Sequence, residues 1–343
     1  VVRDTPIVRV PADYCEIYSP AFIARDSFWY DLEHNQVLSV QLKDNSGYNA
    51  DIEGGISYAG SFVHTLAELT GTAHEIGKQP CLTDEAVYQK VLANVKAWLR
   101  ANPNAKIVSV SQNDSAAEHL GCQCANCKAI DEREGTPMGS LLTFVNRIAN
   151  ELADEYPDLT IDTLAYKYTL KAPKVTKPAE NVCIRLSTIT CHFNHPVTQA
   201  NCLTCASFRD AVKEWGAICD NLYVWDYTTN YAYYLATFPN FHVLRQNMKF
   251  FADNNVKGVY EQGNASGPSG EFGELRAYLL AKLMMYPYMS EEEYYGYMDD
   301  FLKGVYGDGW KYIREYIDIA QEEGSKYHFG TYAEVDEIFP TNI

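Results

Sequence analysis

The chain has 343 residues, of which 47% are hydrophobic, and a formal net charge of -17. The negative charge argues against nucleic-acid binding, which requires a basic surface. No apolar stretch reaches the roughly 20 residues of a membrane span, and the longest, Ala277–Tyr286, contains Lys282. We therefore expect no nucleic-acid partner and no membrane insertion, while the oligomeric state stays open.

The chain starts at Val1 rather than at a methionine and shows no signal-peptide pattern. This start indicates a fragment or a trimmed chain, so the lack of a targeting signal excludes no compartment. A secreted or periplasmic location is expected if the parent protein carries a signal peptide.

The first part of the chain contains two expected strands and one expected helix. Residues 1–20 are a lead-in to a first strand within Ala21–Trp29. Small residues in Gly54–Leu66 indicate a second, close-packed or irregular strand. A helix is expected over Thr83–Arg100, because Thr83 can act as its N-cap and acidic residues follow.

Five later segments are short apolar runs that end in polar residues. Val, Ile, Leu and Tyr follow one another without alternation, as in strands buried on both faces. The segments are Lys106–Asp114, Thr160–Thr169, Asn181–Cys191, Asn221–Tyr231 and Val256–Asn264. Helices are expected between them at Ser140–Tyr156, Ala206–Asn221 and Pro239–Asn254, but the prolines of 170–181 leave no room for a helix.

This alternation of helix and strand predicts an α/β fold, a (β/α) TIM-like barrel, over residues 21–270. Residues 271–343 are expected to be a helical segment packed on the barrel, with helices at 271–286, 290–304 and 308–322. No eighth strand is evident. Either the barrel is incomplete or its last strand lies beyond Ile343.

Three carboxylates stand at the ends of expected strands: Asp114, Asp226 and Glu261. The carboxyl ends of barrel strands converge on one mouth, where active sites lie. Hydrolysis of a glycosidic bond needs one protonated carboxyl and one ionised carboxylate. Each residue could instead cap the next segment or pair with Arg25, Lys167 or Arg276.

Aromatic and hydrogen-bonding side chains crowd the same strand ends. Aromatic faces suit the C–H face of a sugar, and polar groups can bind its hydroxyls. Ordinary barrel packing would explain some of these rings equally well. The expected substrate-binding residues are Arg25, His64, Asn113, Tyr166, Lys167, Trp225, Tyr227, Asn230, Gln262 and Asn264.

Cys122, Cys124 and Cys127 form a C-x-C-x-x-C cluster, and a fourth thiolate could come from Cys191, Cys202 or Cys205. A tetrahedral structural zinc is physically reasonable, and disulfides are equally open. We expect this cluster to stabilise a loop. A metal-dependent hydrolase that uses the cysteines is a weaker alternative. No dinucleotide or phosphate-binding motif is present, so no cofactor for catalysis is expected.

Several segments resemble one bacterial family, catalogued as domain of unknown function 4838, whose members are common among polysaccharide degraders. The similarity runs from about Phe22 to Ile319. It rests on SVSQND with the C-x-C-x-x-C loop, IDTLAYKYTLKAP, IRLSTITCHFNHP, NLYVWDYTTNY, FFADNNVKGVYEQGN and GEFGELRAYLLAKL.

The resemblance implies a glycosidase-type TIM barrel, similar at a distance to alpha-glucuronidases and beta-hexosaminidases. In alpha-glucuronidases the acid follows an Asp-Ser-Glu motif at a strand end. Here the matching place reads Asn113-Asp114-Ser115, which leaves the acid between Asp114 and Glu118. By their order along the chain, Asp226 and Glu261 match the two later carboxylates.

Together these features favour a glycoside hydrolase acting on a glycan or glycoside, including a uronic acid or N-acetylhexosamine linkage. Asp114 is the expected general acid, and Glu261 is the expected base or nucleophile. Asp226 is expected to assist Glu261 or to tune its pKa. The alternative is a non-catalytic glycan-binding barrel, which would keep the aromatic residues and tolerate the loss of either carboxylate.

Overall fold

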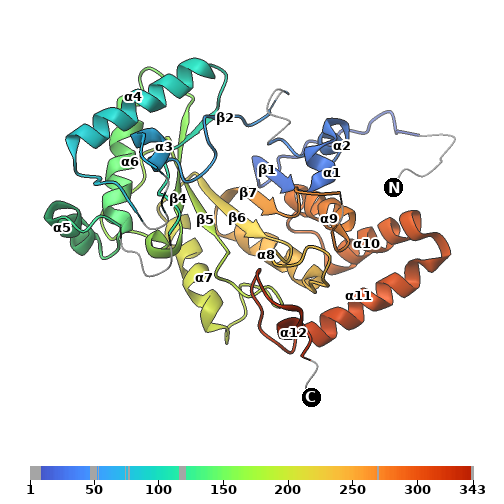
Figure 1. The fold of residues 1–343 in the computed structure, drawn as a ribbon. Coiled ribbons are helices and arrows are strands. Elements are labelled where there is room, and N and C mark those ends of the chain that lie inside the picture. Colours follow the sequence, from blue (N-terminus) through green and yellow to red (C-terminus); the bar gives the residue numbers. More distant parts are fainter. Residues whose placement is uncertain are drawn as a thin grey trace.

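A computed structural model describes residues 9–46, 52, 54–73, 75, 78–115, 121–268 and 270–340. Within these residues seven parallel strands form one curled sheet in the order β1-β7-β6-β5-β4-β3-β2, with helices on its outer side (Figure 1). The strands are β1 (Ala24–Phe28), β2 (Tyr58–Ala59), β3 (Ile107–Ser109), β4 (Thr160–Ala165), β5 (Val182–Ser187), β6 (Leu222–Tyr227) and β7 (Val256–Gln262).

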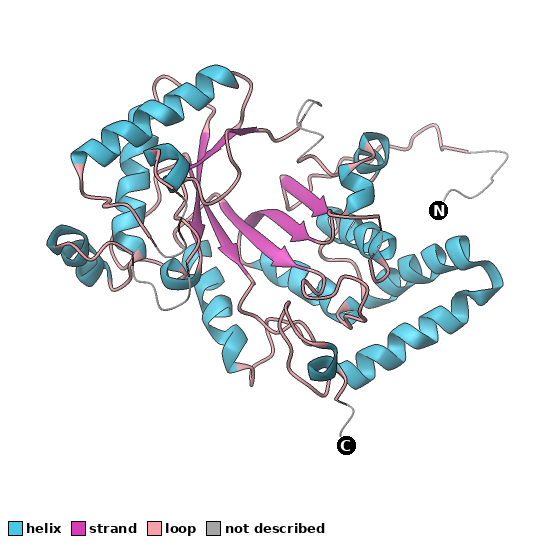
Figure 2. Ribbon diagram, viewed as in Figure 1, coloured by secondary structure: helices cyan, strands magenta, loops and turns pink. Residues whose placement is uncertain are grey.

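The helices alternate with these strands along the chain (Figure 2). No helix in the described ranges combines the length and the apolar character that crossing a bilayer would require. The helices are α1 (Tyr30–Glu33), α2 (Gln36–Gln41), α3 (Leu66–Thr70), α4 (Glu85–Ala101), α5 (Ala125–Glu134), α6 (Met138–Leu152), α7 (Leu203–Gly216), α8 (Phe241–Asp253), α9 (Gly273–Met285), α10 (Glu291–Tyr306), α11 (Trp310–Gly324) and α12 (Val335–Ile338), with short 3₁₀ turns η2 (Lys167–Thr169) and η3 (Gly307–Gly309).

The expected barrel-type fold is confirmed, and its incompleteness has a clear position. β7 pairs directly with β1, from Ala24 opposite Gly258 to Phe28 opposite Gln262. No strand therefore fits between β7 and β1, and the described sheet is open between β1 and β2 instead. The described residues thus form a seven-stranded, incomplete barrel.

Asn45 spans the gap between the two edge strands. Its backbone N–H donates to Arg25 O of β1 (3.1 Å), and its carbonyl accepts from Ile56 N just before β2 (2.7 Å). The side chain of Asn45 accepts from Arg25 N at 2.9 Å. Asp44 Oδ2 accepts from Ser27 N at 2.8 Å. The free edge of β1 is thus hydrogen-bonded to residues that take the place of an eighth strand.

Some element boundaries differ from the sequence-based expectation. Asp84, not Thr83, caps α4, because its side chain accepts from Ala86 N. Helix α5 was not expected, and its C-terminal Glu134 is buried. The crossover from β4 to β5 holds only η2, as its prolines predicted. Glu134 fixes this crossover by accepting hydrogen bonds from Val175 N and Thr176 N at 2.9 and 3.0 Å.

The interior of the barrel is held by a buried ion pair. Side chains alternate along each strand, so apolar residues such as Ile184 and Val224 face the helices while their neighbours face inward. Inside, Arg185 Nη2 of β5 lies 2.6 Å from Asp162 Oδ2 of β4. The guanidinium lies over the Phe62 ring, 4.1 Å from its centroid. This pair fixes β4 against β5.

Replacing Arg185 with methionine is expected to destabilise the fold by about 3–5 kcal/mol, because Asp162 would remain a buried charge without its cation. Lys326→Met is the control, since it removes an exposed ion pair with Glu323 and should cost less than about 1 kcal/mol. Urea unfolding measures both free energies. Similar losses for the two variants would contradict a structural role for the buried pair.

Candidate functional site

Four of the expected site residues meet at the carboxyl ends of β3 and β4. Asp114 Oδ1 accepts a hydrogen bond from the Tyr166 hydroxyl at 3.2 Å. The same oxygen lies 3.5 Å from Lys167 Nζ and 3.9 Å from His64 Nε2. The Asp114 side chain is 34% exposed. We call this group, Asp114 with His64, Tyr166 and Lys167, the Asp114 cluster.

Two residues of the Asp114 cluster, His64 and Lys167, are held by an unusual backbone. His64 has φ 55° and Lys167 has φ 53°, a left-handed conformation that costs energy for residues other than glycine. His64 Nδ1 is 2.8 Å from Gln112 O, so it donates there and directs Nε2 to Asp114. Lys167 Nζ donates to Ser115 O at 2.5 Å. Strained residues of this kind are common at functional sites.

The charge of Asp114 differs from what a general acid requires. Burial raises its pKa, but His64, Lys167 and the hydrogen bonds from Ser115 N and Tyr166 outweigh burial and hold the pKa below its usual range. A carboxylate with a lowered pKa stays ionised near neutral pH. The geometry therefore suits a base, a nucleophile or a hydrogen-bond acceptor better than the acid role expected from the sequence.

An aromatic surface continues from the Asp114 cluster along the inner face of the sheet. Trp225 stacks on Tyr227 with centroids 6.1 Å apart, and it meets Tyr260 at 5.1 Å. Phe62 contacts both Trp225 and Tyr260, at 5.6 and 5.2 Å. Trp225 Nε1 donates to Gln262 Oε1 at 2.5 Å. Trp225, Tyr227 and Gln262 therefore share one surface, next to Asp114.

Tyr332, which the sequence analysis did not single out, extends this aromatic surface. It lies in the loop after α11, and its ring centroid is 5.8 Å from that of Tyr231. It interacts electrostatically with Asp114. Nothing local in the sequence marks this residue, because about 100 residues separate it from β6.

Asp226 and Glu261 lie on the other face of the sheet. They are register partners on β6 and β7, and they alternate with Trp225, Tyr227 and Tyr260, which face inward. Asp226 is 3% exposed and Glu261 is fully buried. The strand pleat thus separates this carboxyl pair from the Asp114 cluster.

Burial raises the pKa of both carboxyls of the pair. Burial raises the pKa of Asp226 to about 6, although the Thr188 hydroxyl and the Tyr227 N–H donate to it. Burial and the nearby Asp226 raise the pKa of Glu261 well above its usual range. Neither Glu261 oxygen has a hydrogen-bond partner among the residues that the structure describes. Glu261 therefore keeps its proton over much of the range in which Asp114 is ionised, and Asp226 keeps its proton up to about pH 6.

The remaining expected binding residues have structural hydrogen bonds. Arg25 donates to Lys43 O and Phe22 O. The Asn113 side chain joins Ala67 N to Lys78 O. Asn230 binds Ala333 O and two backbone N–H groups, and Asn264 binds Ser266 N and Gly267 O. These side chains position loops around the site. Glu118, the less favoured acid, lies outside the described residues.

A cleft of about 440 Å³ at the gap between β1 and β2 contains two further carboxyls, Asp26 and Glu33. Its walls include the rings of Phe28, Phe62 and Tyr260. Burial raises the pKa of Glu33 to about 8 and that of Asp26 to about 6. Protonated carboxyls beside aromatic rings are candidate proton donors. Glu33 ends α1, five residues after the end of β1, and a carboxyl this close to a strand end is the signal that could have identified it.

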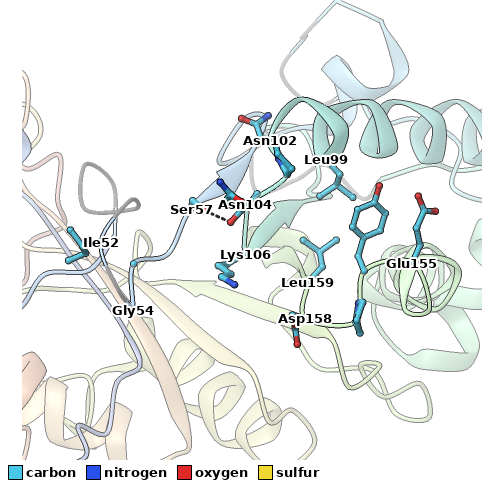
Figure 3. A pocket seen from close by; sticks show the side chains of 15 residues that line it. Ile52, Gly54, Ser57, Leu99, Asn102, Asn104, Lys106, Glu155, Asp158 and Leu159 are labelled. Atoms are coloured by element: carbon cyan, nitrogen blue, oxygen red, sulfur yellow. Dashed lines mark hydrogen bonds between the residues drawn. The ribbon is translucent and has the colours of Figure 1, made fainter.

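A different hollow, of about 560 Å³, lies at the amino-terminal ends of the strands (Figure 3). Its lining includes Ser57, Lys106 and Leu159, which directly precede β2, β3 and β4. Glu155 and Asp158 add negative charge there. Barrel active sites occupy the carboxyl ends instead. We therefore assign the candidate site to the Asp114 cluster, the aromatic surface and the cleft beside Glu33.

The C-x-C-x-x-C cluster gains its fourth sulfur from Cys81. Cys81, Cys122, Cys124 and Cys127 have sulfur atoms within 4.8 Å of one another, and all are free thiols. Cys81 Sγ is 3.6 Å from Cys124 Sγ. The expectation that Cys191, Cys202 or Cys205 completes the cluster is wrong. Cys81 was missed because 40 residues separate it from the motif.

The fold and the site together define a (β/α) barrel-type protein with chemically capable side chains at its carboxyl-terminal mouth. The chain belongs to the family described as Domain of unknown function (DUF4838), whose sequence profile matches residues 62–318. This match confirms the family resemblance. None of the curated proteins compared with the chain matches it.

Several solved structures of glycoside hydrolases are similar to the chain at low identity. A Bacteroidetes-affiliated GH5 cellulase linked with a polysaccharide utilization locus has TM-score 0.36 and 10% identity, over 64% of this chain and 66% of that chain. A GH18 chitinase from Pseudoalteromonas aurantia has TM-score 0.34 and 11% identity, over 74% and 98%. A GH5-4 endoglucanase from Bacteroides salanitronis has TM-score 0.33 and 10% identity, over 81% and 99%.

The buried carboxyl pair predicts that the protein loses stability as pH rises. Asp226 and Glu261 keep their protons in the folded chain at pH values where the unfolded chain releases them, so the unfolding free energy falls from about pH 4 upwards through the folded pKa values. Glu261→Gln should flatten this decline by roughly 1–3 kcal/mol. Urea unfolding at several pH values measures it. Exposed Glu315→Gln is the control, and identical slopes for both variants would contradict the assignment.

Proposed function

We propose that the protein is a glycoside hydrolase that acts on a glycan or glycoside at the mouth of its barrel. The observation that supports this most is an ionised, accessible carboxylate, Asp114, beside a continuous surface of aromatic rings. Rings bind the apolar face of a sugar, and the carboxylate can attack the anomeric carbon or activate water. Lys167 supplies positive charge for a sugar carboxylate, and His64 adds to it when protonated.

In this proposal Asp114 is the base or nucleophile, and a second carboxyl with a raised pKa is the acid. Two carboxyl groups compete for that role. Glu33 lines the cleft beside the inner aromatic surface. Glu261 is the choice from the sequence, but it is buried behind the sheet. Accessibility favours Glu33, since a general acid must reach the leaving oxygen.

Hydrolysis of aryl glycosides, aryl uronides and aryl N-acetylhexosaminides tests the proposal. Asp114→Asn is expected to lower kcat by roughly 100-fold or more on any substrate turned over. Glu33→Gln should lower kcat and remove the decline of kcat/KM near pH 8, because the Glu33 pKa is about 8. Exposed Asp308→Asn is the control.

Full activity of Asp114→Asn would remove the assignment of the site. A loss of activity in Glu261→Gln at unchanged thermal stability, with Glu33→Gln unaffected, would return the acid role to Glu261. The product anomer then reports the mechanism, because retention needs carboxyls about 5–5.5 Å apart and inversion about 6.5–9.5 Å.

A second candidate function is glycan binding without catalysis. The burial of Asp226 and Glu261 behind the sheet favours it, because it leaves Asp114 without the two carboxylate partners that the sequence assigned. This function predicts that the wild type binds a glycan that it does not cleave. Binding should survive Asp114→Asn and weaken when Trp225 is replaced with alanine.

We also propose that Cys81, Cys122, Cys124 and Cys127 bind a structural zinc ion. The sulfur spacing of 3.6 Å suits a tetrahedral site with Zn–S bonds of about 2.3 Å. Four thiolates fill every ligand position, which leaves none for a substrate or water. This ligand count disfavours the metal-dependent hydrolase. The ion would join the segment before α4 to the N-terminus of α5.

Cys81→Ser is expected to lower the zinc content by one equivalent per chain and to lower the Tm, because metal binding contributes to folding stability. Exposed Cys15→Ser is the matched control and should change neither value. Elemental analysis and thermal unfolding give the two readouts. Unchanged zinc in Cys81→Ser, or a disulfide within the cluster on peptide mapping, would rule out this site.

A further inference from the structure

A second group of metal-ligating side chains lies apart from the four cysteines. His192 and His195 belong to the loop after β5, Cys202 is the N-cap of α7, and His328 lies in the loop after α11. One nitrogen of each histidine and the Cys202 sulfur lie within 4.8 Å of one another. We call these four residues the histidine cluster.

The spacing inside the histidine cluster matches ligands around one ion. His328 Nδ1 is 3.0 Å from His192 Nδ1 and 3.2 Å from His195 Nε2. Cys202 Sγ is 3.4 Å from His192 Nδ1. A tetrahedral ion with bonds of about 2.0–2.1 Å to nitrogen and 2.3 Å to sulfur puts its ligand atoms about 3.3–3.6 Å apart. The observed separations are close to these values.

Hydrogen bonds among the four side chains do not account for the close approach of their nitrogen and sulfur atoms. His195 Nδ1 is 3.0 Å from Pro196 O, a carbonyl that can only accept. Nδ1 therefore carries the proton, and Nε2 of the neutral ring presents a lone pair to the cluster. His328 Nδ1 faces two ring nitrogens but has at most one proton to donate. A backbone carbonyl that fixes the tautomer is typical of histidines that bind metals.

We propose that His192, His195, Cys202 and His328 bind one divalent transition-metal ion, with Zn²⁺ as the best fit. Imidazole and thiolate are the ligands this ion prefers. Cys202 would supply the sulfur ligand, because its Sγ lies 3.4 Å from His192 Nδ1 at the N-terminus of α7. Four protein ligands close the site, so the ion is structural.

The ion would hold the loop after α11 against the mouth of the barrel. This loop already contacts the strand ends, since Phe193 N donates to Phe329 O (3.1 Å) and Tyr231 N to Thr331 O (2.6 Å). Figure 1 shows the red C-terminal segment beside the ends of β5 and β6. The same loop carries Tyr332 to the aromatic surface. Metal binding at His328 would therefore restrain the position of Tyr332, which lies four residues further along the same loop.

A dithiol is the competing use of the same region. Cys202 and Cys205 form a C-x-x-C at a helix N-terminus, an arrangement typical of redox pairs. The Cys205 sulfur, however, is engaged by the backbone, accepting from His192 N at 3.3 Å. A redox pair would also give no role to the three converging histidines. The three converging histidines therefore favour the metal site. A disulfide between Cys202 and Cys205 is the alternative result that the experiment can detect.

The test uses His328→Ala, since His328 is exposed and its loss should leave the fold intact. We expect the purified wild type to hold two equivalents of metal, His328→Ala and Cys81→Ser one each, and the double variant none. Exposed His34→Ala is the matched control and should hold two. Limited proteolysis should cut His328→Ala within residues 325–334 at least 10-fold faster than the wild type and Cys81→Ser.

Cobalt substitution gives a second readout. Co²⁺ added to metal-free Cys81→Ser should produce the absorption of a tetrahedral ion with one thiolate, and the double variant should not. Unchanged metal content in His328→Ala, or a Cys202–Cys205 disulfide in the native protein on peptide mapping, would overturn the proposal. None of these readouts depends on glycosidase activity.

Discussion

The ion pair between Arg185 and Asp162 is the constraint on which the mouth of the barrel depends. A barrel open between β1 and β2 has no closed ring of backbone hydrogen bonds to set its curvature. The guanidinium instead joins β5 to β4 and lies over Phe62, which in turn contacts the rings of β6 and β7. A buried charge pair is favourable only while both partners remain. The curl of the sheet and the aromatic surface therefore form together.

The strand pleat divides the acidic groups into two populations. The pKa of Asp114 is lowered beside Lys167 and His64, whereas burial between sheet and helices raises the pKa of Asp226 and of Glu261. The three look equivalent in the sequence, because each ends an apolar run. Their chemistry differs because alternate residues of a strand face opposite layers, which makes solvent access and neighbouring charge differ completely.

Much of the architecture could be predicted because burial on both faces leaves a mark on each strand. The runs containing Val108, Ile184 and Val259 are continuous apolar segments, and all became strands of the sheet. The site could be predicted only in part. Asp114, Tyr166 and Lys167 follow strand ends and do meet. Cys81 and His328 join their clusters from distant segments, and such pairings depend on tertiary packing that no local pattern records. The face of the sheet on which Glu261 lies depends on the register of β7. A shift of one residue would move its side chain to the opposite face.

Asn45 has a consequence for how the protein behaves at high concentration. An edge strand normally offers a row of unpaired N–H and C=O groups to other chains, which is a route to aggregation and to strand exchange. Here Asn45 and Asp44 bind the backbone of β1 through side chains as well as main chain. The edge is therefore blocked without a full strand. Asp44 and Asn45 thus occupy backbone groups of β1 that a second chain would otherwise pair with.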